Sequence, residues 1–503
     1  MYRCIIAVGM VRRCMRFFLG FVLTSAIYSI GCGDSVDHSP PTPGPPVSDV
    51  TGTIVDTHVT ESGDISAMRA PSQFEVAAVF PGDDGKPREI LAVIDKSGMF
   101  VISNVPEVPY DLRFVEFYGA GTLPPRYIMN APRNIDLGRV YVGRPDAELV
   151  ETNPSEIALT ATGLEPWSDG DTLELFSLGS GSAGPLVPTG GTYPAAGATS
   201  LSDYRVDTSR LLNATLVNGG KGDTAVITQL AGTAHPTAPY HSVRKVFEAP
   251  SFTQTDGTLA NVSGAFSDVI QEQLPIDISA SEFNAFAGAV HKAATVSGKN
   301  IRIIAEPGGE RATTSMTPTL LLCEALPSAT LPASFSYGNP FPPAWAEVVS
   351  ADVSFVMTHT APTGISKSTA VTIGQSGPVG SFATPVVPLI GPPLDIKIND
   401  MPAHDTLTGI GFSPTITFSP PSVGTPAAYI VAIRRLDPGG STTRTMAIFS
   451  TTEPMLRIPE GLLDFGYYYY FRISVRANFD IAQPFKSSTT NAYASALTGV
   501  LTP

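Results

Sequence analysis

The chain has 503 residues, enough for about two to four domains, and its 43% of hydrophobic residues excludes a wholly disordered chain. Acidic residues outnumber basic ones, 45 against 31, and the resulting net charge of −14 disfavours nucleic acid as a partner. Only 15% of the residues are charged, whereas glycine and proline contribute 46 each. This composition predicts an all-β protein of short strands joined by turns.

The first 31 residues have the features of a signal peptide. Residues 17–30 (FFLGFVLTSAIYSI) are apolar, and the run is short for a transmembrane helix. The stretch before it contains no acidic residue, and its basic residues are Arg3, Arg12, Arg13 and Arg16. If this segment is removed, the remaining chain is still more acidic.

The signal-like segment ends in residues 29–32 (SIGC), which resemble the lipobox of bacterial lipoproteins. In that family a small residue precedes the cysteine, as Gly31 does here, whereas Ser29 and Ile30 depart from the usual pattern. The resemblance implies cleavage before Cys32 and lipidation of its thiol. The alternative is an ordinary secretory signal with an incidental cysteine.

Residues 32–47 (CGDSVDHSPPTPGPPV) are polar and proline-rich, and they predict an extended tether. In proteobacterial lipoproteins an aspartate directly after the lipidated cysteine favours retention in the inner membrane. Gly33 occupies that position, so the resemblance implies a protein of the cell envelope anchored in the outer membrane. The expected partner at this end is the membrane, through the lipid.

We predict that residues 48–145 form the first folded module. Strands are expected near residues 50–56, 74–80, 90–94, 95–102 and 110–114, with turns between them. This order resembles the carboxypeptidase regulatory-like β-sandwich, and the matching residues are Gly98, Phe100, Pro106, Tyr110 and Leu112. The family's glycine before the tyrosine is replaced by Val108-Pro109. The resemblance implies a non-catalytic accessory domain.

Three aspartates of this module could be read as calcium ligands: Asp83, Asp84 and Asp95. Aspartates that flank glycine are more often turn formers, because the short side chain accepts hydrogen bonds from nearby backbone amides. No twelve-residue calcium loop is present. We therefore expect no metal here.

We predict that residues 146–395 form a β-rich middle domain with one short helix, whose topology the sequence does not determine. Residues 170–178 and 222–230 each combine a Gly-Asp-Thr turn with an alternating strand, which is compatible with a blade-like or sandwich repeat. The helix is expected at residues 279–294, with Ser279 and Glu282 as a capping box. Further strands are expected near residues 300–306 and 348–358.

Candidate chemistry in the middle domain is sparse. His235, His241 and His291 lack the spacing of metal ligands on one helix face or strand. Residues 219–222 (GGKG) resemble a phosphate-binding loop only superficially, because the lysine is not followed by serine or threonine. Cys323 lies in an apolar run and is expected to be a buried, inert thiol.

Aromatic residues offer a second kind of site. Trp167 and Trp345, with residues 337–342 (YGNPFP), could form sugar-stacking platforms. Packing in a core or an interface is the commoner use of such side chains.

We predict that residues 396–503 form the last folded module. Strands are expected near residues 414–421, 429–433, 456–459 and 463–477. The module resembles a fibronectin type III domain, whose tyrosine corner is matched by Leu463, Gly466 and Tyr469. On the last of these strands, the core side chains are expected to be Phe471, Ile473 and Val475. Phe418 replaces the family's buried tryptophan, and the usual alanine after the last strand has moved to Ala477.

The leading functional hypothesis is a lipid-anchored, non-catalytic binding or scaffold protein of the cell envelope, with β-sandwiches on either side of the middle domain. We expect a polysaccharide or another envelope protein as ligand, no cofactor, and no site residue other than Cys32. The alternative is a secreted lipoprotein hydrolase, acting on polysaccharide or ester, with its catalytic centre in the middle domain. Its candidate carboxylates are Asp171, Asp223, Glu248 and Asp256. A third hypothesis is a structural part of an envelope machine.

Overall fold

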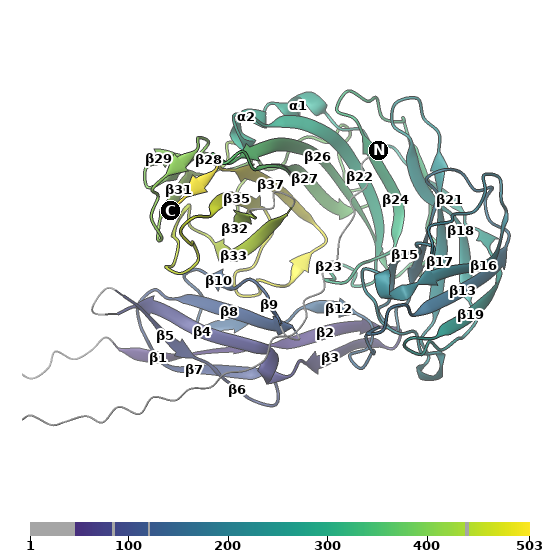
Figure 1. The fold of residues 1–503 in the computed structure, drawn as a ribbon, viewed down its shortest axis with the longest axis horizontal. Helices are drawn as coiled ribbons and strands as arrows, with labels where there is room; N and C mark the ends of the chain where they lie inside the picture. Colours follow the sequence, from purple (N-terminus) through teal and green to yellow (C-terminus); the bar gives the residue numbers. More distant parts are fainter. Residues whose placement is uncertain (1–45, 83–85, 119–120, 438–441) are drawn as a thin grey trace, which may run out of the picture. The chain divides into compact units, whose positions relative to one another are not determined.

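The computed structural model describes residues 46–82, 86–118, 121–437 and 442–503. Strands dominate these residues, and the predicted all-β, multi-domain class is confirmed (Figure 1). These residues form one compact unit. The predicted lipidation site Cys32, and the aspartates Asp83 and Asp84, lie outside the described residues.

The first module is a β-sandwich. One sheet has the strand order β11-β1-β7-β6, and the facing strands pair in the order β5-β4-β8-β10. The predicted strands are present, and the side chains between the layers include Phe100, Ile102 and Phe114, which are fully buried. The bounds are β1 (Val47–Thr53), β4 (Phe74–Pro81), β5 (Pro87–Leu91), β6 (Val93–Ile94), β7 (Met99–Pro106), β8 (Asp111–Tyr118), β9 (Gly121–Thr122), β10 (Arg126–Ile128) and β11 (Asn134–Asp136).

The strand expected at residues 50–56 divides at Ile54. Its second half, β2 (Val55–Thr60), leaves the sandwich and forms a separate sheet with β3 (Gly63–Met68) and β12 (Val140–Val142). Gly52 is required before the division, because a Cβ there would clash with the Ile135 carbonyl oxygen and with the Phe100 ring.

Asp95 forms the turn before β7. Its Oδ1 accepts hydrogen bonds from the backbone N–H of Ser97 at 2.8 Å and of Met99 at 3.1 Å, and from the Ser97 hydroxyl at 2.7 Å. The Ser97 hydroxyl and amide lower the pKa of this carboxyl. Asp95 is therefore a turn former, as the sequence predicts.

The middle of the chain contains two hydrophobic cores. The first core lies between the sheet β16-β13-β19 and the antiparallel strands β14, β17 and β18, and it includes Trp167, Leu175 and Phe247. The bounds are β13 (Glu156–Thr162), β14 (Thr172–Phe176), β15 (Ala183–Pro185), β16 (Ser200–Asp207), β17 (Ala225–Thr233), β18 (Tyr240–Ala249) and β19 (Leu259–Ala265), with 3-10 turns η2 (Thr208–Arg210) and η3 (Gly219–Lys221).

The second core is shared with the C-terminal module. Its long strands pair in the antiparallel order β18-β24-β22-β26-β27. The bounds are β20 (Ser267–Asp268), β21 (Gln271–Leu274), β22 (Thr295–Glu306), β23 (Arg311–Ala312), β24 (Thr319–Ala325), β25 (Phe335–Gly338), β26 (Ala346–Thr360) and β27 (Ser366–Pro378).

The two Gly-Asp-Thr segments pair with each other. Their strands β14 and β17 are antiparallel neighbours, with Thr172 opposite Leu230 and Phe176 opposite Val226. They are thus adjacent strands of one sheet, and not equivalent strands of two successive blades.

The helical segment lies where the sequence predicts it, as two short helices, α1 (Ala280–Asn284) and α2 (Ala287–Val290). Phe283 and Val290 are fully buried, as the spacing predicts. Ser279 is the N-cap of α1, but its side chain makes no capping hydrogen bond, so the predicted capping box does not form. Helical structure ends at Val290, before the predicted Ala294, because His291 is extended.

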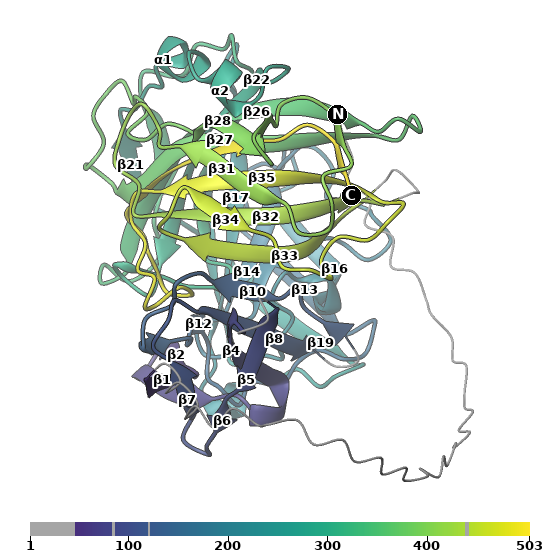
Figure 2. The same cartoon turned by 90° about the vertical axis from the view of Figure 1, so that its left-hand side faces the viewer.

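The C-terminal module is a β-sandwich (Figure 2). One layer has the order β29-β28-β31-β34, and the other pairs β33-β32-β35-β37. The bounds are β28 (Leu394–Ile398), β29 (Met401–Pro402), β30 (Leu407–Thr408), β31 (Thr415–Ser419), β32 (Ala428–Leu436), β33 (Thr443–Thr451), β34 (Met455–Arg457), β35 (Tyr468–Arg476), β36 (Ser487–Ser488), β37 (Asn491–Leu497) and β38 (Leu501–Thr502).

The predicted tyrosine corner is present. The Tyr469 side chain is fully buried, and its hydroxyl accepts a hydrogen bond of 2.8 Å from the backbone N–H of Asp464. Gly466 adopts φ +84°, which favours glycine. The predicted core side chains Phe471, Ile473 and Val475 are fully buried.

Both faces of β35 are covered, although its sequence alternates. Tyr470, on the face opposite to Phe471, is 3% exposed and stacks on the His359 ring of β26 at 4.0 Å. The outer face of this sandwich is therefore part of the core shared with the middle strands.

Two strand pairings continue the C-terminal sheet into its neighbours. On one edge, β10 of the first module pairs in parallel with β33, and the Tyr127 and Phe449 rings stack at 4.9 Å. On the other edge, β27 pairs with β37, with Gly374 opposite Tyr493. One 20-stranded sheet therefore runs through all three segments of the chain.

Three histidines meet at the junction between the middle strands and the C-terminal module. His359 and His291 are 1% and 3% exposed, and the His291 ring lies 4.8 Å from that of His404. Burial lowers the pKa of His359 and of His291 to about 4. Lys292, beside this cluster, is paired with Asp405.

Removal of the Tyr469 hydroxyl tests the tyrosine corner. Tyr469→Phe leaves the Asp464 amide without its acceptor, so we expect the free energy of unfolding to fall by about 1 to 2 kcal/mol. Denaturant titration measures the change. Tyr468→Phe is the matched control, because no hydrogen bond of its hydroxyl is seen among the described residues; an equal loss in both variants contradicts the assigned role.

The buried histidines make stability depend on pH. Between pH 6.5 and pH 4 the folded protein keeps His359 and His291 neutral, whereas the unfolded chain takes up protons. The free energy of unfolding is therefore highest above pH 6.5 and falls as the pH drops to 4, by at most about 3 kcal/mol for each imidazole. The free energy of unfolding, measured at several pH values, should depend less on pH in the His359→Phe variant than in the His241→Phe variant. An identical dependence on pH in both variants contradicts the assignment.

Candidate functional site

A pocket of about 570 Å³ opens where β14 ends, β17 begins and β18 ends. The turn between β2 and β3, which belongs to the first module, adds Glu61 to its wall. Apart from Glu61, Thr224 and Glu248, the lining is apolar: Phe176, Leu178, Ala225, Val226, Ala249, Pro340, Phe341, Pro342, Pro343 and Trp345. This volume is in the usual range for small-molecule and side-chain sites.

Three aromatic rings form one wall. Phe341 and Trp345 stack with their planes 8° apart and their centroids 5.1 Å apart. Phe176 meets both rings edge-on, at 6.0 Å from Phe341 and 5.5 Å from Trp345. Phe341 and Phe176 are buried, whereas Trp345 is only half-buried.

The segment that carries Phe341 and Trp345 connects β25 to β26 and is held rigidly. The Asn339 side chain accepts a hydrogen bond from the Phe341 N–H at 2.9 Å and donates one to Glu347 at 2.6 Å. Glu347 also accepts from the Tyr337 hydroxyl at 2.7 Å. Prolines at 340, 342 and 343 fix the backbone φ angle between these anchors. The aromatic wall is therefore formed before any ligand arrives.

Two glutamates form the polar rim. Glu248 is exposed and lies opposite Val226 in the β17–β18 ladder. Glu61 is also exposed and accepts a hydrogen bond from the Thr224 hydroxyl. No lysine, arginine or histidine is among the described residues that line the pocket.

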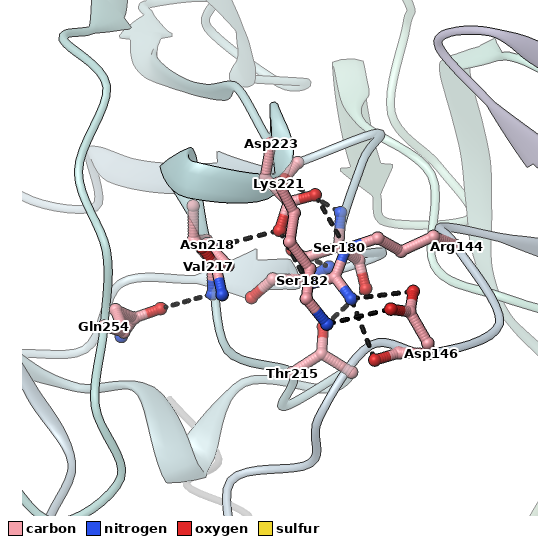
Figure 3. A network of polar contacts seen from close by, with 11 residues as sticks. Arg144, Asp146, Ser180, Ser182, Thr215, Val217, Asn218, Lys221, Asp223 and Gln254 are labelled. Atoms are coloured by element: carbon pink, nitrogen blue, oxygen red, sulfur yellow. Dashed lines mark hydrogen bonds and ion pairs between the residues drawn. The ribbon is translucent and has the colours of Figure 1, made fainter.

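A buried ion pair fixes the turn that precedes Thr224 (Figure 3). Arg144 donates from Nε and Nη2 to the two carboxylate oxygens of Asp223, each at 3.0 Å. Asp223 Oδ2 also accepts from the Asn218 backbone N–H at 2.8 Å. The hydrogen bonds to Asp223 raise the pKa of Arg144. The pair thus places the start of β17 at the edge of the pocket.

Lys221 and Asp146 extend this network on its exposed side. Lys221 donates to Asp146 at 2.8 Å, and Arg144 donates to the other carboxylate oxygen at 2.9 Å. These two cations lower the pKa of Asp146 to about 2. Residues 219–222 form the 3-10 turn η3 with Gly222 at φ +89°. This segment is therefore a structural turn whose lysine is already paired.

The four candidate carboxylates do not meet. Asp171 is buried and accepts from the backbone N–H of Ser168 and Gly232 at 2.9 and 2.8 Å. Asp256 accepts from Thr152 and Ser155 in another loop. Asp223 is paired with Arg144, so only Glu248 reaches the pocket.

The histidines named in the sequence are also apart. His235 shapes its own loop, accepting from the backbone N–H of Ala238 at 3.1 Å. His291 belongs to the buried histidine cluster described above. Within the described part of the chain, no three His, Cys, Asp or Glu side chains are grouped as a metal site requires.

Two further predictions are confirmed. Trp167 is 4% exposed and packs in the core between β13 and β14. Cys323 is buried, and burial raises the pKa of its thiol to about 11.

Among the described residues, no helix is long and apolar enough to cross a membrane.

The sequence indicates Trp345 and the segment 337–342 as candidates, but it does not mark Glu61 or Phe176. Thr224, which bonds to Glu61, is 163 positions away along the chain. No local pattern marks such a partner. The sequence indicates Phe176 only as part of an alternating strand.

No protein-family description matches the chain, and no curated protein matches it. Solved structures similar to it include the FN1–FN3 domains of chicken CNTN1, at 6% identity, over 90% of this chain and 96% of that chain, with a TM-score of 0.14. A tetra-tandem repeat from the extending region of a large adhesion protein is 10% identical over 91% and 99% of the two chains, with a TM-score of 0.11. Salmonella alpha-2-macroglobulin is 8% identical over 93% and 40%, with a TM-score of 0.15. At these TM-scores the likenesses carry no argument about function.

Loss of the Arg144 guanidinium tests the support beneath the pocket. Arg144→Met leaves the Asp223 carboxylate, 2% exposed, without its cation, and we expect the free energy of unfolding to fall by about 3 kcal/mol. Denaturant unfolding measures this loss. The control is Arg205→Met, which breaks the exposed pair with Asp203 and should cost less than about 1 kcal/mol; similar losses contradict the structural role of Asp223.

Proposed function

We propose that this protein is a lipid-anchored, non-catalytic binding or scaffold protein of the bacterial cell envelope. The observation that carries the binding role is the preformed aromatic pocket, in which Trp345 remains half-buried beside two exposed glutamates. Among the described residues, most large aromatic side chains are buried in cores, whereas Trp345 packs against one and is only half-buried. A rigid, partly exposed aromatic wall suits binding because little conformational entropy is lost there.

The anchoring role rests on the sequence. Residues 29–32 (SIGC) follow an apolar stretch of signal-peptide length, and the segment after Cys32 is polar and proline-rich. We propose that Cys32 carries the lipid, that residues 32–47 space the modules from the bilayer, and that Gly33 directs the protein to the outer membrane.

We further propose that residues 48–145 form a carboxypeptidase regulatory-like domain with an accessory role. Three observations support it. Gly98 turns with φ +82° before β7, and Phe100 and Leu112 are fully buried at the positions that the family pattern requires. The domain boundaries near residues 145 and 395 remain part of this proposal.

Replacement of the anchoring thiol tests the placement. Cys32→Ser removes the acylation site, so we expect the protein to leave the membrane fraction and to incorporate no labelled palmitate. Cys323→Ser is the matched control and should retain both properties. Continued membrane association of the Cys32→Ser variant, with no palmitate in the wild type, contradicts the proposal.

An activity screen separates binding from catalysis. The purified full chain is assayed on panels of glycosides, esters and peptides, and we expect no turnover. Hydrolysis that Glu248→Gln abolishes would establish the hydrolase alternative instead, because Glu248 and Glu61 are the two carboxylates in the pocket.

A further inference from the structure

We infer that the aromatic pocket binds a lysine or arginine side chain presented by a partner protein. This inference rests on the proposed binding function and specifies its ligand. It follows from three properties of the pocket: the charge of its lining, the position of its aromatic rings and the kind of hydrogen-bonding groups it offers.

The charge of the lining is negative. Glu61 and Glu248 are its charged side chains. Lys221, near Thr224 in sequence, is paired with Asp146, and Lys245, near Glu248, is paired with Asp268. None of the ion pairs seen among the described residues uses Glu61 or Glu248, since the Glu61 contact is with the Thr224 hydroxyl. A cation that enters the pocket therefore meets two carboxylates and, in the described lining, no competing positive group.

The aromatic wall suits the same ligand. The half-buried Trp345 lines the pocket together with Glu61 and Glu248, and tryptophan is the side chain that attracts a cation most strongly through its ring. The apolar part of the lining, which includes Leu178, Ala225 and Val226, can contact an aliphatic stem. Lysine and arginine combine a cationic head with such a stem.

Neutral sugar is a poorer match to this lining. Sugar hydroxyls both donate and accept hydrogen bonds, whereas the side chains here offer carboxylate acceptors and one hydroxyl, which already donates to Glu61. The described part of the lining contains no amide or guanidinium side chain that could donate to a ring oxygen. An ammonium or guanidinium group needs only acceptors, which is what the pocket supplies.

Trp345 provides a direct readout, because the only other tryptophan of the sequence is Trp167. In the Trp167→Phe background, titration of the full chain with pentalysine should change the Trp345 emission and saturate. We expect Glu248→Gln to weaken this binding about tenfold and added salt to weaken it further. Glu460→Gln, at an exposed glutamate of the C-terminal module, should bind as the parent does.

Cellopentaose and pentaglutamate are titrated in parallel. Saturable binding of cellopentaose without binding of pentalysine overturns the inference and leaves the proposed binding function standing. Pentalysine that binds the parent, the Glu248→Gln variant and a Glu61→Gln/Glu248→Gln double variant equally well also overturns it, because the contact is then with the acidic surface at large. If pentalysine does not change the Trp345 emission at all, the inference is overturned as well. Thermal unfolding of each variant verifies that its fold is intact.

Discussion

The free edges of the C-terminal sheet are the constraint on which the rest of the structure depends. An edge strand carries unpaired backbone N–H and C=O groups, which attract further strands unless they are covered. Here β10 covers the edge of β33, with backbone hydrogen bonds from Ile448 to Pro125 at 3.0 Å and from Met129 to Ser450 at 2.9 Å. On the opposite side β27 covers β37. Both partners come from other segments of the chain, so the modules are joined by main-chain hydrogen bonds and not only by side-chain packing.

This joining explains why one core serves two segments. Because β27 continues the sheet of the C-terminal module, the side chains of β26 pack directly against β35, and Tyr470 is buried under His359. A β-sandwich standing alone would expose that face. The buried histidines are a consequence, since an imidazole at such a junction is kept from water on every side.

The sequence was a good guide wherever the determining contacts are local. Alternation located β4, β7, β8 and β35, and the spacing of Leu463, Gly466 and Tyr469 located the tyrosine corner, because its hydrogen bond closes over five residues. Long-range pairing left no such mark. The junctions of β10 with β33 and of β27 with β37 join residues that are far apart in sequence, and each edge presents the same backbone groups whatever its side chains.

The acidic residues that stabilise the fold differ in position and side-chain length from those available to a ligand. Three of the aspartates have short side chains next to turns: Asp171, Asp223 and Asp256. Each carboxylate accepts hydrogen bonds from backbone N–H groups of its own or a neighbouring loop, and it is therefore not available to a ligand. Glu248 is different, because it lies near the end of β18, is exposed to solvent and lines the same pocket as Trp345. A carboxylate that no turn requires, held beside a rigid aromatic wall, is the kind of group that a ligand can use without disturbing the fold.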